Sequence, residues 1–178
     1  DRQAVAELER LLVDADVLLQ NMRPGAMEQM GLDSQTLLQR YPKLVYCAIS
    51  AYGARGPMRG NAGYEAMIQA FSGMWSVNGD ETGPPTRVGT PILDYGTGVW
   101  TALGCIAALL RRATSGRGGL VDTSLMETSL GWLSGQFSTF SRNGRQPPRH
   151  RSGSPILVVS DTFQTADDQA LQRQFGRD

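Results

Sequence analysis

Asp94 is the residue of this 178-residue chain whose surroundings best suit covalent chemistry. It follows a short apolar run at 91–93 and precedes an apolar segment whose pattern predicts a helix over about 95–112. Because the amino end of a helix stabilises an ionised carboxylate by about 0.3–1 kcal/mol, Asp94 could act as a nucleophile or a base. A purely structural N-cap is the alternative interpretation of the same position.

Three further side chains are candidates for chemistry or binding. Tyr64 and Glu65 stand at the head of another predicted helix and could supply a hydroxyl and a second carboxylate. Arg23 could hold a phosphate or a carboxylate, since a guanidinium binds such groups with two hydrogen bonds. Glu127 stands three residues after Ser124, and this S-x-x-E pattern predicts a capping box, which is a structural role.

The remaining composition excludes several classes of protein and site. One histidine (His150) and two cysteines (Cys47 and Cys105) cannot form a Cys/His zinc site, and we expect two reduced, buried thiols and no metal. Seventeen basic residues balance seventeen acidic ones, which argues against a nucleic-acid partner. Because no apolar run approaches about 20 residues and no secretory signal is visible, we expect a cytoplasmic protein without a membrane partner.

The elements that must position these residues alternate between helix and strand. In the first fifty residues, the patterns predict a helix over 2–14, a strand over 17–19, short helices after 26 and after 33, and a strand over 44–50. Such alternation is typical of a parallel α/β sheet covered on both faces, in which ligands lie beyond the carboxyl ends of the strands. We therefore expect the site at the loops 20–25 and 51–57.

The rest of the chain continues this pattern and then loses it. We expect a helix over 63–74, the buried helix of about 95–112, a strand over 120–123, a helix over 125–140 and a strand over 155–160. The last 18 residues show no core pattern. We therefore interpret residues 1–143 as a core α/β segment and residues 144–178 as a linker with the start of a following region.

Five stretches, in this order and spacing, resemble the class III CoA-transferases, the family of formyl-CoA transferase, carnitine CoA-transferase and α-methylacyl-CoA racemase. They are ADVLLQNMRPGAMEQMGL (15–32), LVYCAISAYGARGP (44–57), GYEAMIQAFSG (63–73), GPPTRVGTPILDYGTG (83–98) and TSGRGGLVDTSLMET (114–128). The resemblance implies a parallel-sheet, Rossmann-like domain with long buried helices, of which the amino- and carboxyl-terminal parts are missing here. It therefore identifies the chain as a fragment of such an enzyme.

The resemblance also implies roles for the catalytic positions. Asp94 matches the aspartate that attacks the acyl-CoA thioester in the transferases, and Glu65 would lie near the reacting carboxylates. In the racemases a histidine of a G-H-D motif works with the aspartate, and here Tyr64 stands at that position. Because an ordinary tyrosine has a pKa near 10, this difference favours a transferase over a racemase.

The CoA-binding positions follow from the same matching. Asn21, Met22 and Ala26 would line the CoA loop, and Tyr64 would contact CoA. An arginine that contacts CoA in some members is replaced here by a glutamine, and Arg23 is our hypothesis for its substitute.

CoA would enter as a thioester substrate rather than as a tightly bound cofactor, and the partners would be an acyl-CoA and a carboxylic acid acceptor. The resemblance further implies an interlocked homodimer for the full-length protein. The alternatives are an acyl-CoA racemase or epimerase, and a non-catalytic module that binds CoA or assembles with another chain.

Overall fold

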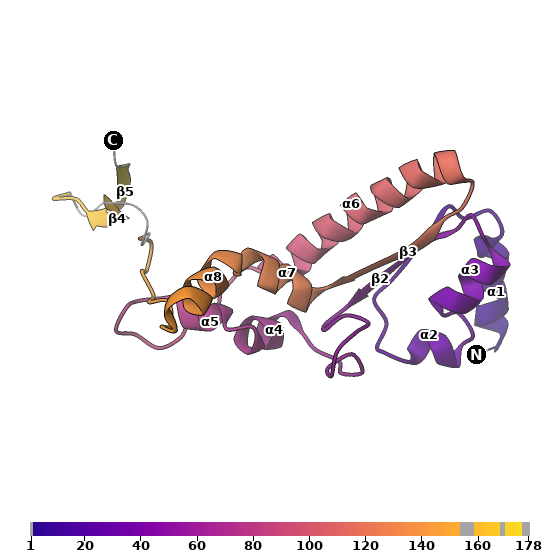
Figure 1. Ribbon diagram of the computed structural model, residues 1–178, viewed down its shortest axis with the longest axis horizontal. Coiled ribbons are helices and arrows are strands. Elements are labelled where there is room, and N and C mark those ends of the chain that lie inside the picture. Colours follow the sequence, from indigo (N-terminus) through magenta and orange to yellow (C-terminus); the bar gives the residue numbers. More distant parts are fainter. Residues whose placement is uncertain (1, 154–158, 168–169, 176–178) are drawn as a thin grey trace. The chain divides into compact units, whose positions relative to one another are not determined.

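The structure is a computed structural model that describes residues 2–153, 159–167 and 170–175. The chain divides into two compact units, each drawn from two separate stretches of sequence (Figure 1). Unit 1 comprises Asp1–Ile68 and Pro91–Gly131, and unit 2 comprises Gln69–Thr90 and Trp132–Asp178. All of the predicted site residues belong to unit 1.

A parallel sheet of three strands forms the centre of unit 1. Its order is β1-β2-β3, with β1 at Val17–Gln20, β2 at Val45–Ser50 and β3 at Gly119–Ser124. Val17 lies opposite Val45, and Ser50 lies opposite Ser124, so the three carboxyl ends share one edge. The prediction of a parallel α/β sheet is confirmed, and its central strand is the continuous apolar run of the sequence.

Helices cover both faces of this sheet (Figure 1). One face is covered by α1 (Arg2–Leu12), α2 (Ala26–Gln29) and α3 (Ser34–Arg40), and the other by α6 (Ile92–Ser115). Successive side chains of a strand point to opposite faces, and β2 contributes to both cores. Tyr46 packs with Leu37 of α3, whereas Val45 and Cys47 pack with Ala108 of α6. Burial on both sides explains why β2 carries no polar alternation.

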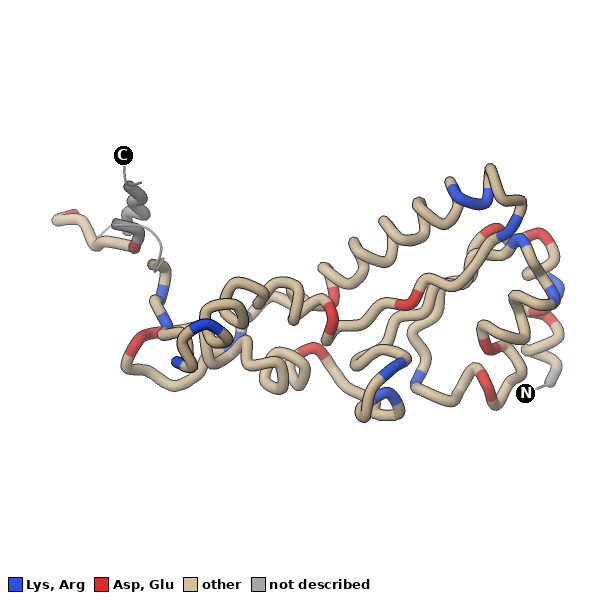
Figure 2. Tube along the Cα trace, in the orientation of Figure 1, with Lys and Arg blue, Asp and Glu red and all other residues tan. Residues whose placement is uncertain are grey.

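The amino end of α6 differs from the sequence prediction. The helix begins at Ile92, so Asp94 lies inside its first turn, and it ends at Ser115 rather than near 112. Pro91 occupies the N-cap position, which corrects the interpretation of Asp94 as the N-cap. Figure 2 shows a negative residue at the amino end of α6 and positive residues at its carboxyl end, an arrangement that complements the helix dipole.

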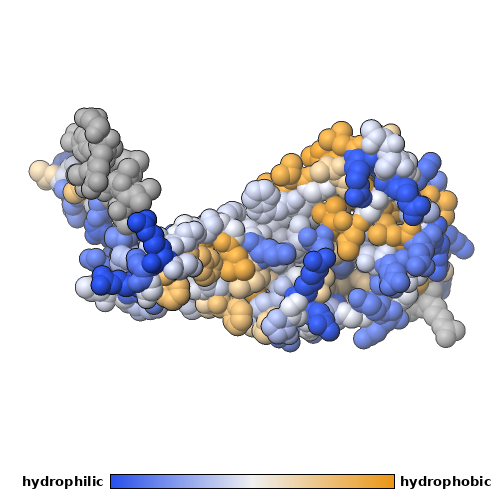
Figure 3. Space-filling model, in the orientation of Figure 1, coloured by the Kyte–Doolittle hydropathy of each residue, from blue (hydrophilic) through white to orange (hydrophobic). Residues whose placement is uncertain are grey.

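The prediction of a buried helix holds for one side of α6 and is wrong for the other, which is exposed in this chain. The buried side includes Leu93, Thr97 and Thr101, each at most 1% exposed. The exposed side carries large apolar side chains that are 50–69% exposed: Val99, Trp100, Leu103, Ile106 and Leu110. Figure 3 shows apolar surface along this helix. A contiguous apolar surface of this kind is typical of an interface.

By length and composition, α6 is the one helix in the described part of the chain that could cross a membrane. Its buried side packs on the sheet, whereas its largest apolar side chains are exposed in this chain. A Cβ added at Gly104 would lie 2.7 Å from Cγ1 of Val121, so the helix contacts β3 closely at this glycine. Two threonines of the same side also form hydrogen bonds with β3 and the following helix.

Unit 2 is organised by buried hydrogen bonds. Its helices include α5 (Met74–Val77) and α8 (Ser134–Asn143), and its strands β4 (Val159–Gln164) and β5 (Ala170–Phe175) form an antiparallel pair. Gln69 is fully buried and pairs with both backbone groups of Val88, with N···O distances of 3.0 and 3.2 Å. Its Oε1 also accepts a hydrogen bond from the indole of Trp75 at 3.2 Å. The side-chain amide of Gln69 thus provides hydrogen-bond partners for the backbone of Val88, which does not lie in a strand.

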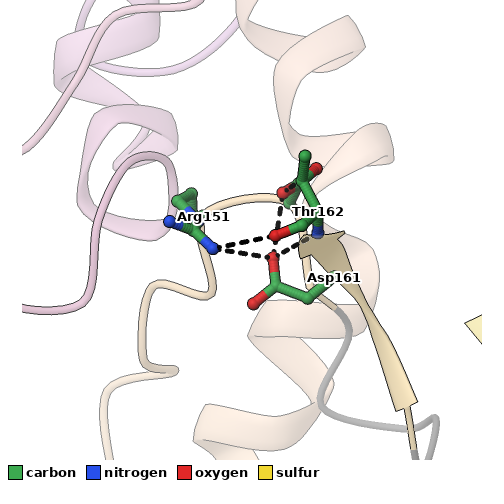
Figure 4. A network of polar contacts seen from close by, with 4 residues as sticks. Arg151, Asp161 and Thr162 are labelled. Carbon is green, nitrogen blue, oxygen red and sulfur yellow. Dashed lines mark hydrogen bonds and ion pairs between the residues drawn. The ribbon is translucent and has the colours of Figure 1, made fainter. Parts of the chain in front are cut away.

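Two arginines fix the carboxyl-terminal part of unit 2. Arg149 donates hydrogen bonds to the carbonyl oxygens of Asp80, Glu81 and Gly83, which holds the loop rich in turn residues. Arg151 donates to the carbonyl of Thr162 at 3.1 Å and forms an ion pair with Asp161 at 3.5 Å (Figure 4). The pKa of Asp161 is lowered by the N–H of Thr162, the hydroxyl of Ser152 and this guanidinium.

Several element boundaries differ from the predictions. The segments 63–74 and 125–140 each form two helices instead of one, because the first is interrupted at Gly73 (φ 84°) and the second at Leu133 (φ −88°, ψ 8°). The helices are α4 (Glu65–Phe71) with α5, and α7 (Leu125–Trp132) with α8. Of the strand predicted at 155–160, residues 155–158 lie outside the described residues, and β4 begins at Val159. Strand β5 lies in a segment for which we predicted no core pattern.

Candidate active site

The loop that follows β1 presents three of the predicted binding residues to solvent. Asn21, Met22 and Arg23 are all exposed, and the N–H of Met22 donates to the side-chain Oε1 of Gln20 at 2.8 Å. Gly25 then adopts a left-handed conformation (φ 85°), which lets the chain turn directly into α2 at the half-buried Ala26. The predicted CoA loop therefore lies at the carboxyl edge of the sheet, where ligands of parallel sheets bind.

Asp94 occupies the first turn of α6 and is exposed. The backbone N–H groups of a first turn have no partner within the helix, and together with the helix dipole they favour a negative charge there. An exposed carboxylate at this place can meet a substrate, which a side chain sealed in the core could not do. The position suits a carboxylate that acts in its ionised form.

Glu65 connects the start of α4 to the start of α6. Its residue surface is only 6% exposed, and Oε1 accepts a hydrogen bond from the N–H of Leu93 at 3.5 Å. Leu93 directly precedes Asp94, so the structure brings Glu65 to the turn that carries the candidate nucleophile. Tyr64, the preceding residue, is 73% exposed. The pair predicted at the head of this helix is therefore divided between the protein interior and the surface.

Two pairs of threonines hold the amino-terminal half of α6 from behind. The hydroxyl oxygens of Thr97 and Thr128 are 2.8 Å apart, and those of Thr101 and Thr123 are 2.6 Å apart. Thr97 also donates to the carbonyl of Leu93 at 2.7 Å. These contacts connect α6 to α7 and β3 one turn beyond Asp94. The sequence pattern did not reveal them, because threonines on an apolar helix have no distinctive spacing.

The start of α7 confirms the predicted capping box. The Ser124 hydroxyl accepts the N–H of Glu127 at 3.1 Å and donates to the Glu127 carboxylate at 2.8 Å. The same end of β3 carries Asp122, which we did not single out from the sequence. Its Oδ2 accepts the N–H of Ala54, in the loop after β2, at 3.3 Å. Aspartate is rare in β-strands, so its presence in the predicted strand 120–123 could have marked this residue in the sequence.

Two groups near the sheet have perturbed acidity. Partial desolvation raises the pKa of Asp122, the Glu127 carboxylate adds to this shift, and the Ala54 N–H and the Arg55 guanidinium act against it. Burial, together with the neighbouring thiol of Cys105, raises the pKa of Cys47 to about 11. Both cysteines are free, as expected, but only Cys47 is buried, and Cys105 is half-buried, which corrects the expectation of two buried thiols. The thiol of Cys47 is protonated at neutral pH.

Other places in the molecule are weaker candidates for the site. A cavity of about 260 Å³ lies in unit 2 among α5, α8 and residues 146–147, and none of the predicted site residues lines it. Within the described ranges, no group of three or more His, Cys, Asp or Glu side chains could hold a metal ion. The predicted residues thus fall into two sets, one after β1 and one around the starts of α4 and α6.

Comparison with known proteins gives a consistent result. The sequence profile of CoA-transferase family III matches residues 1–174. An "Acyl-CoA transferase" from Fusarium pseudograminearum is 36% identical over 157 residues, which are 88% of this chain and 34% of that protein. The "Acetyl-CoA:oxalate CoA-transferase" of Acetobacter aceti is 34% identical over 168 residues, which are 94% of this chain and 42% of that protein.

Solved structures agree with these sequence matches. The crystal structure of a CAIB/BAIF family protein from Brucella suis superposes with a TM-score of 0.85 at 29% identity. The match covers 94% of this chain and 44% of that protein. The chain therefore spans less than half the length of the relatives that it matches.

Proposed function

This chain belongs to CoA-transferase family III, and from that premise we propose that it carries the nucleophilic segment of an enzyme that moves CoA from an acyl-CoA thioester to a carboxylic acid. The observation that carries the proposal is the exposed carboxylate of Asp94 in the first turn of α6. The names of the relatives support CoA transfer as the reaction class.

The proposed reaction is a sequence of acyl substitutions at Asp94. Its carboxylate attacks the thioester carbonyl, the C–S bond breaks, and CoA leaves as a thiolate while a mixed anhydride forms. The thiolate then attacks the aspartyl carbonyl, which releases the first acid as a carboxylate and leaves an aspartyl-CoA thioester. The acceptor carboxylate attacks this thioester to form a second anhydride, from which the returning thiolate takes the new acyl group and frees Asp94. The route replaces one difficult exchange with easier covalent steps.

In this proposal Glu65 acts beside the reacting carboxylates. Because its carboxylate accepts the N–H of Leu93, it fixes the backbone from which Asp94 projects. A nucleophile held in one orientation loses less entropy on reaching the transition state. Glu65 would also repel a second carboxylate in its immediate vicinity, which confines the acceptor acid to the exposed side of Asp94.

CoA would bind across the loop after β1 and the start of α4. Asn21, Met22, Arg23 and Ala26 line the first part of this proposed site, and the exposed Tyr64 supplies the second. Arg23 is the cation of this set, and we assign it to a CoA phosphate. CoA is then a substrate that arrives and leaves as a thioester, with no tightly bound cofactor.

The second candidate function is a non-catalytic module that binds CoA or assembles with another chain. It is favoured by the exposed apolar side of α6, since a surface of this kind is typical of an interface. An acyl-CoA racemase is disfavoured by Tyr64, whose phenol is a poor base at neutral pH. For the complete protein we also propose a cytoplasmic location and an interlocked homodimer, and the exposed apolar side of α6 supports the latter.

Exchange of labelled CoA into acetyl-CoA distinguishes these functions. A transferase incorporates label, and Asp94→Asn abolishes incorporation without weakening acetyl-CoA binding. Asp14→Asn is the matched control, since Asp14 is an exposed aspartate between α1 and the amino end of β1, away from the carboxyl ends of the strands. Binding without exchange in the unmodified chain supports the module instead. Solvent deuterium at the α-carbon of an acyl-CoA, without CoA exchange, supports a racemase.

A further inference from the structure

The loop that follows β2 is held to the ends of β3 and α7 at several points. The Ala54 N–H donates to Oδ2 of Asp122 at 3.3 Å, and the N–H of Met126 donates to the carbonyl of Ala51 at 3.0 Å. These bonds join segments more than sixty residues apart in sequence. The loop is thereby fixed to the sheet by the neighbouring strand and helix.

Gly53 lets this loop approach α7 closely. Its φ of 85° is a left-handed conformation that other residues rarely adopt. A Cβ at this glycine would lie 3.5 Å from the hydroxyl oxygen of Ser124 and 3.8 Å from Cδ of Glu127. The backbone of the loop therefore packs against the capping box at the start of α7, next to Asp122.

The other side of the same loop supports the start of α4. A Cβ at Gly63 would lie 3.0 Å from Cβ of Ala51, 3.2 Å from Cε2 of Tyr52 and 3.3 Å from Cδ1 of Ile68. The backbone before α4 thus lies directly on the loop with no space between them. Two residues later, Glu65 reaches the N–H that precedes Asp94.

Asp122 is exposed, and opposing influences act on its charge. Partial desolvation and the Glu127 carboxylate both disfavour its ionised form, while the Ala54 N–H and Arg55 favour it, and the balance raises its pKa. The Ala54 N–H is the group through which this carboxylate holds the loop.

We propose that Asp122 is a positioning residue for the site: by holding the loop at Ala54 it provides the support on which Gly63, and with it Tyr64 and Glu65, are placed. The role of Asp122 in catalysis rests on the proposed function, whereas its contacts with the loop do not depend on that function. Asp122 does not itself touch the proposed reacting groups.

Hydrogen exchange of the backbone amides tests this placement in the chain as it exists. Asp122→Ala removes the acceptor, and we expect the amide of Ala54 to exchange about tenfold faster, as loss of a hydrogen bond to a charged acceptor implies. The amide of Ile68, which donates to the carbonyl of Tyr64 at 3.1 Å, should also exchange faster because the start of α4 loses its support. Asp14→Ala is the matched control and should change neither amide. Faster exchange at Ala54 with Ile68 unaltered overturns the proposal, since the loop would then not support α4.

The pH dependence of amide exchange distinguishes an effect of the Asp122 charge from an effect of side-chain packing. It is measured on the unmodified chain, so it applies even if Asp122→Ala does not fold. The Ala54 N–H favours the ionised form of Asp122, so protonation of Asp122 should weaken this bond and make a local opening that breaks only this bond easier. In the unmodified chain, protection of the Ala54 and Ile68 amides should therefore fall on acidification as Asp122 takes up a proton. Asp122→Asn keeps a neutral acceptor and should lack this step. The same step in Asp122→Asn contradicts the proposal.

Binding of acetyl-CoA, measured by titration calorimetry, keeps the two proposals distinguishable. If Asp122 positions the site, Asp122→Asn weakens binding and Asp14→Asn does not. If the unmodified chain binds no acetyl-CoA, the proposed function fails for this chain, while the exchange measurements still decide whether Asp122 positions α4.

Discussion

The threonine pair behind Asp94 allows a worked prediction. Thr97 is fully buried and Thr128 is 5% exposed, and each hydroxyl has one proton to donate. Thr97 is within hydrogen-bond distance of the carbonyl of Leu93, Thr128 of the carbonyl of Ser124, and the two hydroxyl oxygens lie 2.8 Å apart. Two protons therefore serve three contacts, and the hydroxyl–hydroxyl bond competes with a bond to one of the carbonyls.

Thr97→Val removes the hydroxyl and keeps the shape of the side chain. It deletes one or two hydrogen bonds of about 1 kcal/mol each, while Thr128 can still donate to Ser124, so we expect a loss of about 1–2 kcal/mol in the free energy of unfolding. Thr128→Val should cost a similar amount. Because the shared bond is counted in both single changes, the double variant should cost about 0.5–1 kcal/mol less than the sum.

Urea unfolding followed by circular dichroism measures these free energies, with Thr139→Val as the control. Thr139 also donates to a carbonyl four residues earlier, but it is exposed on α8, so its replacement should change stability by less than about 0.5 kcal/mol. Additive effects of Thr97→Val and Thr128→Val would refute the shared bond. A loss no larger than that of the control would refute the claim that these hydroxyls hold α6.

Three further predictions concern other buried or capping groups. Glu65→Gln keeps an acceptor for the N–H of Leu93 and should lower the free energy of unfolding by less than about 1 kcal/mol in urea unfolding. Glu65→Ala removes the acceptor and should lower it by about 1–3 kcal/mol. Equal losses for the two variants would show that this hydrogen bond contributes nothing to stability. Gln69→Leu removes the partner of the half-buried backbone groups of Val88 and of the Trp75 indole N–H and should cost about 1–3 kcal/mol in urea unfolding. A change below about 1 kcal/mol would contradict the pairing described above. Asp33 caps α3 by accepting hydrogen bonds from the hydroxyl and the N–H of Thr36, and these bonds lower the pKa of Asp33. The cap therefore stabilises the fold above the ordinary aspartate pKa, and this stabilisation is lost as the pH falls through the lowered pKa of Asp33 in the folded protein. Asp33→Ala should lower stability by about 0.5–2 kcal/mol at neutral pH and remove that acid-side loss, and an unchanged stability–pH curve would exclude the cap.

The parts of the fold that follow from local patterns were predictable. The apolar run of β2, the Asp33 cap and the Ser124–Glu127 capping box each depend on residues within a few positions of one another. Parallel pairing then follows from the alternation of helix and strand. These features need no knowledge of distant segments.

The parts that depend on tertiary contacts were not predictable. Gly73 and Leu133 interrupt two helices whose apolar spacing continues across the break, and periodicity contains no sign of this. The contact of the Glu65 carboxylate with the first turn of α6 joins two helices that are 28 residues apart in sequence. Asp122 contacts a loop 68 residues away, a distance over which sequence patterns carry no information.

The covalent bond that we propose between Asp94 and the substrate can be detected directly by peptide mapping. Acetyl-CoA and hydroxylamine should convert an activated aspartate into an aspartyl hydroxamate. Cleavage after Arg87 and Arg111 gives a peptide, residues 88–111, in which Asp94 is the only carboxylic side chain, so its mass alone assigns the site. We predict the hydroxamate on this peptide, at a level that Asp94→Asn abolishes. A hydroxamate on the neighbouring peptide that carries Glu65, or an unmodified 88–111 peptide in a chain that exchanges CoA, would contradict the account.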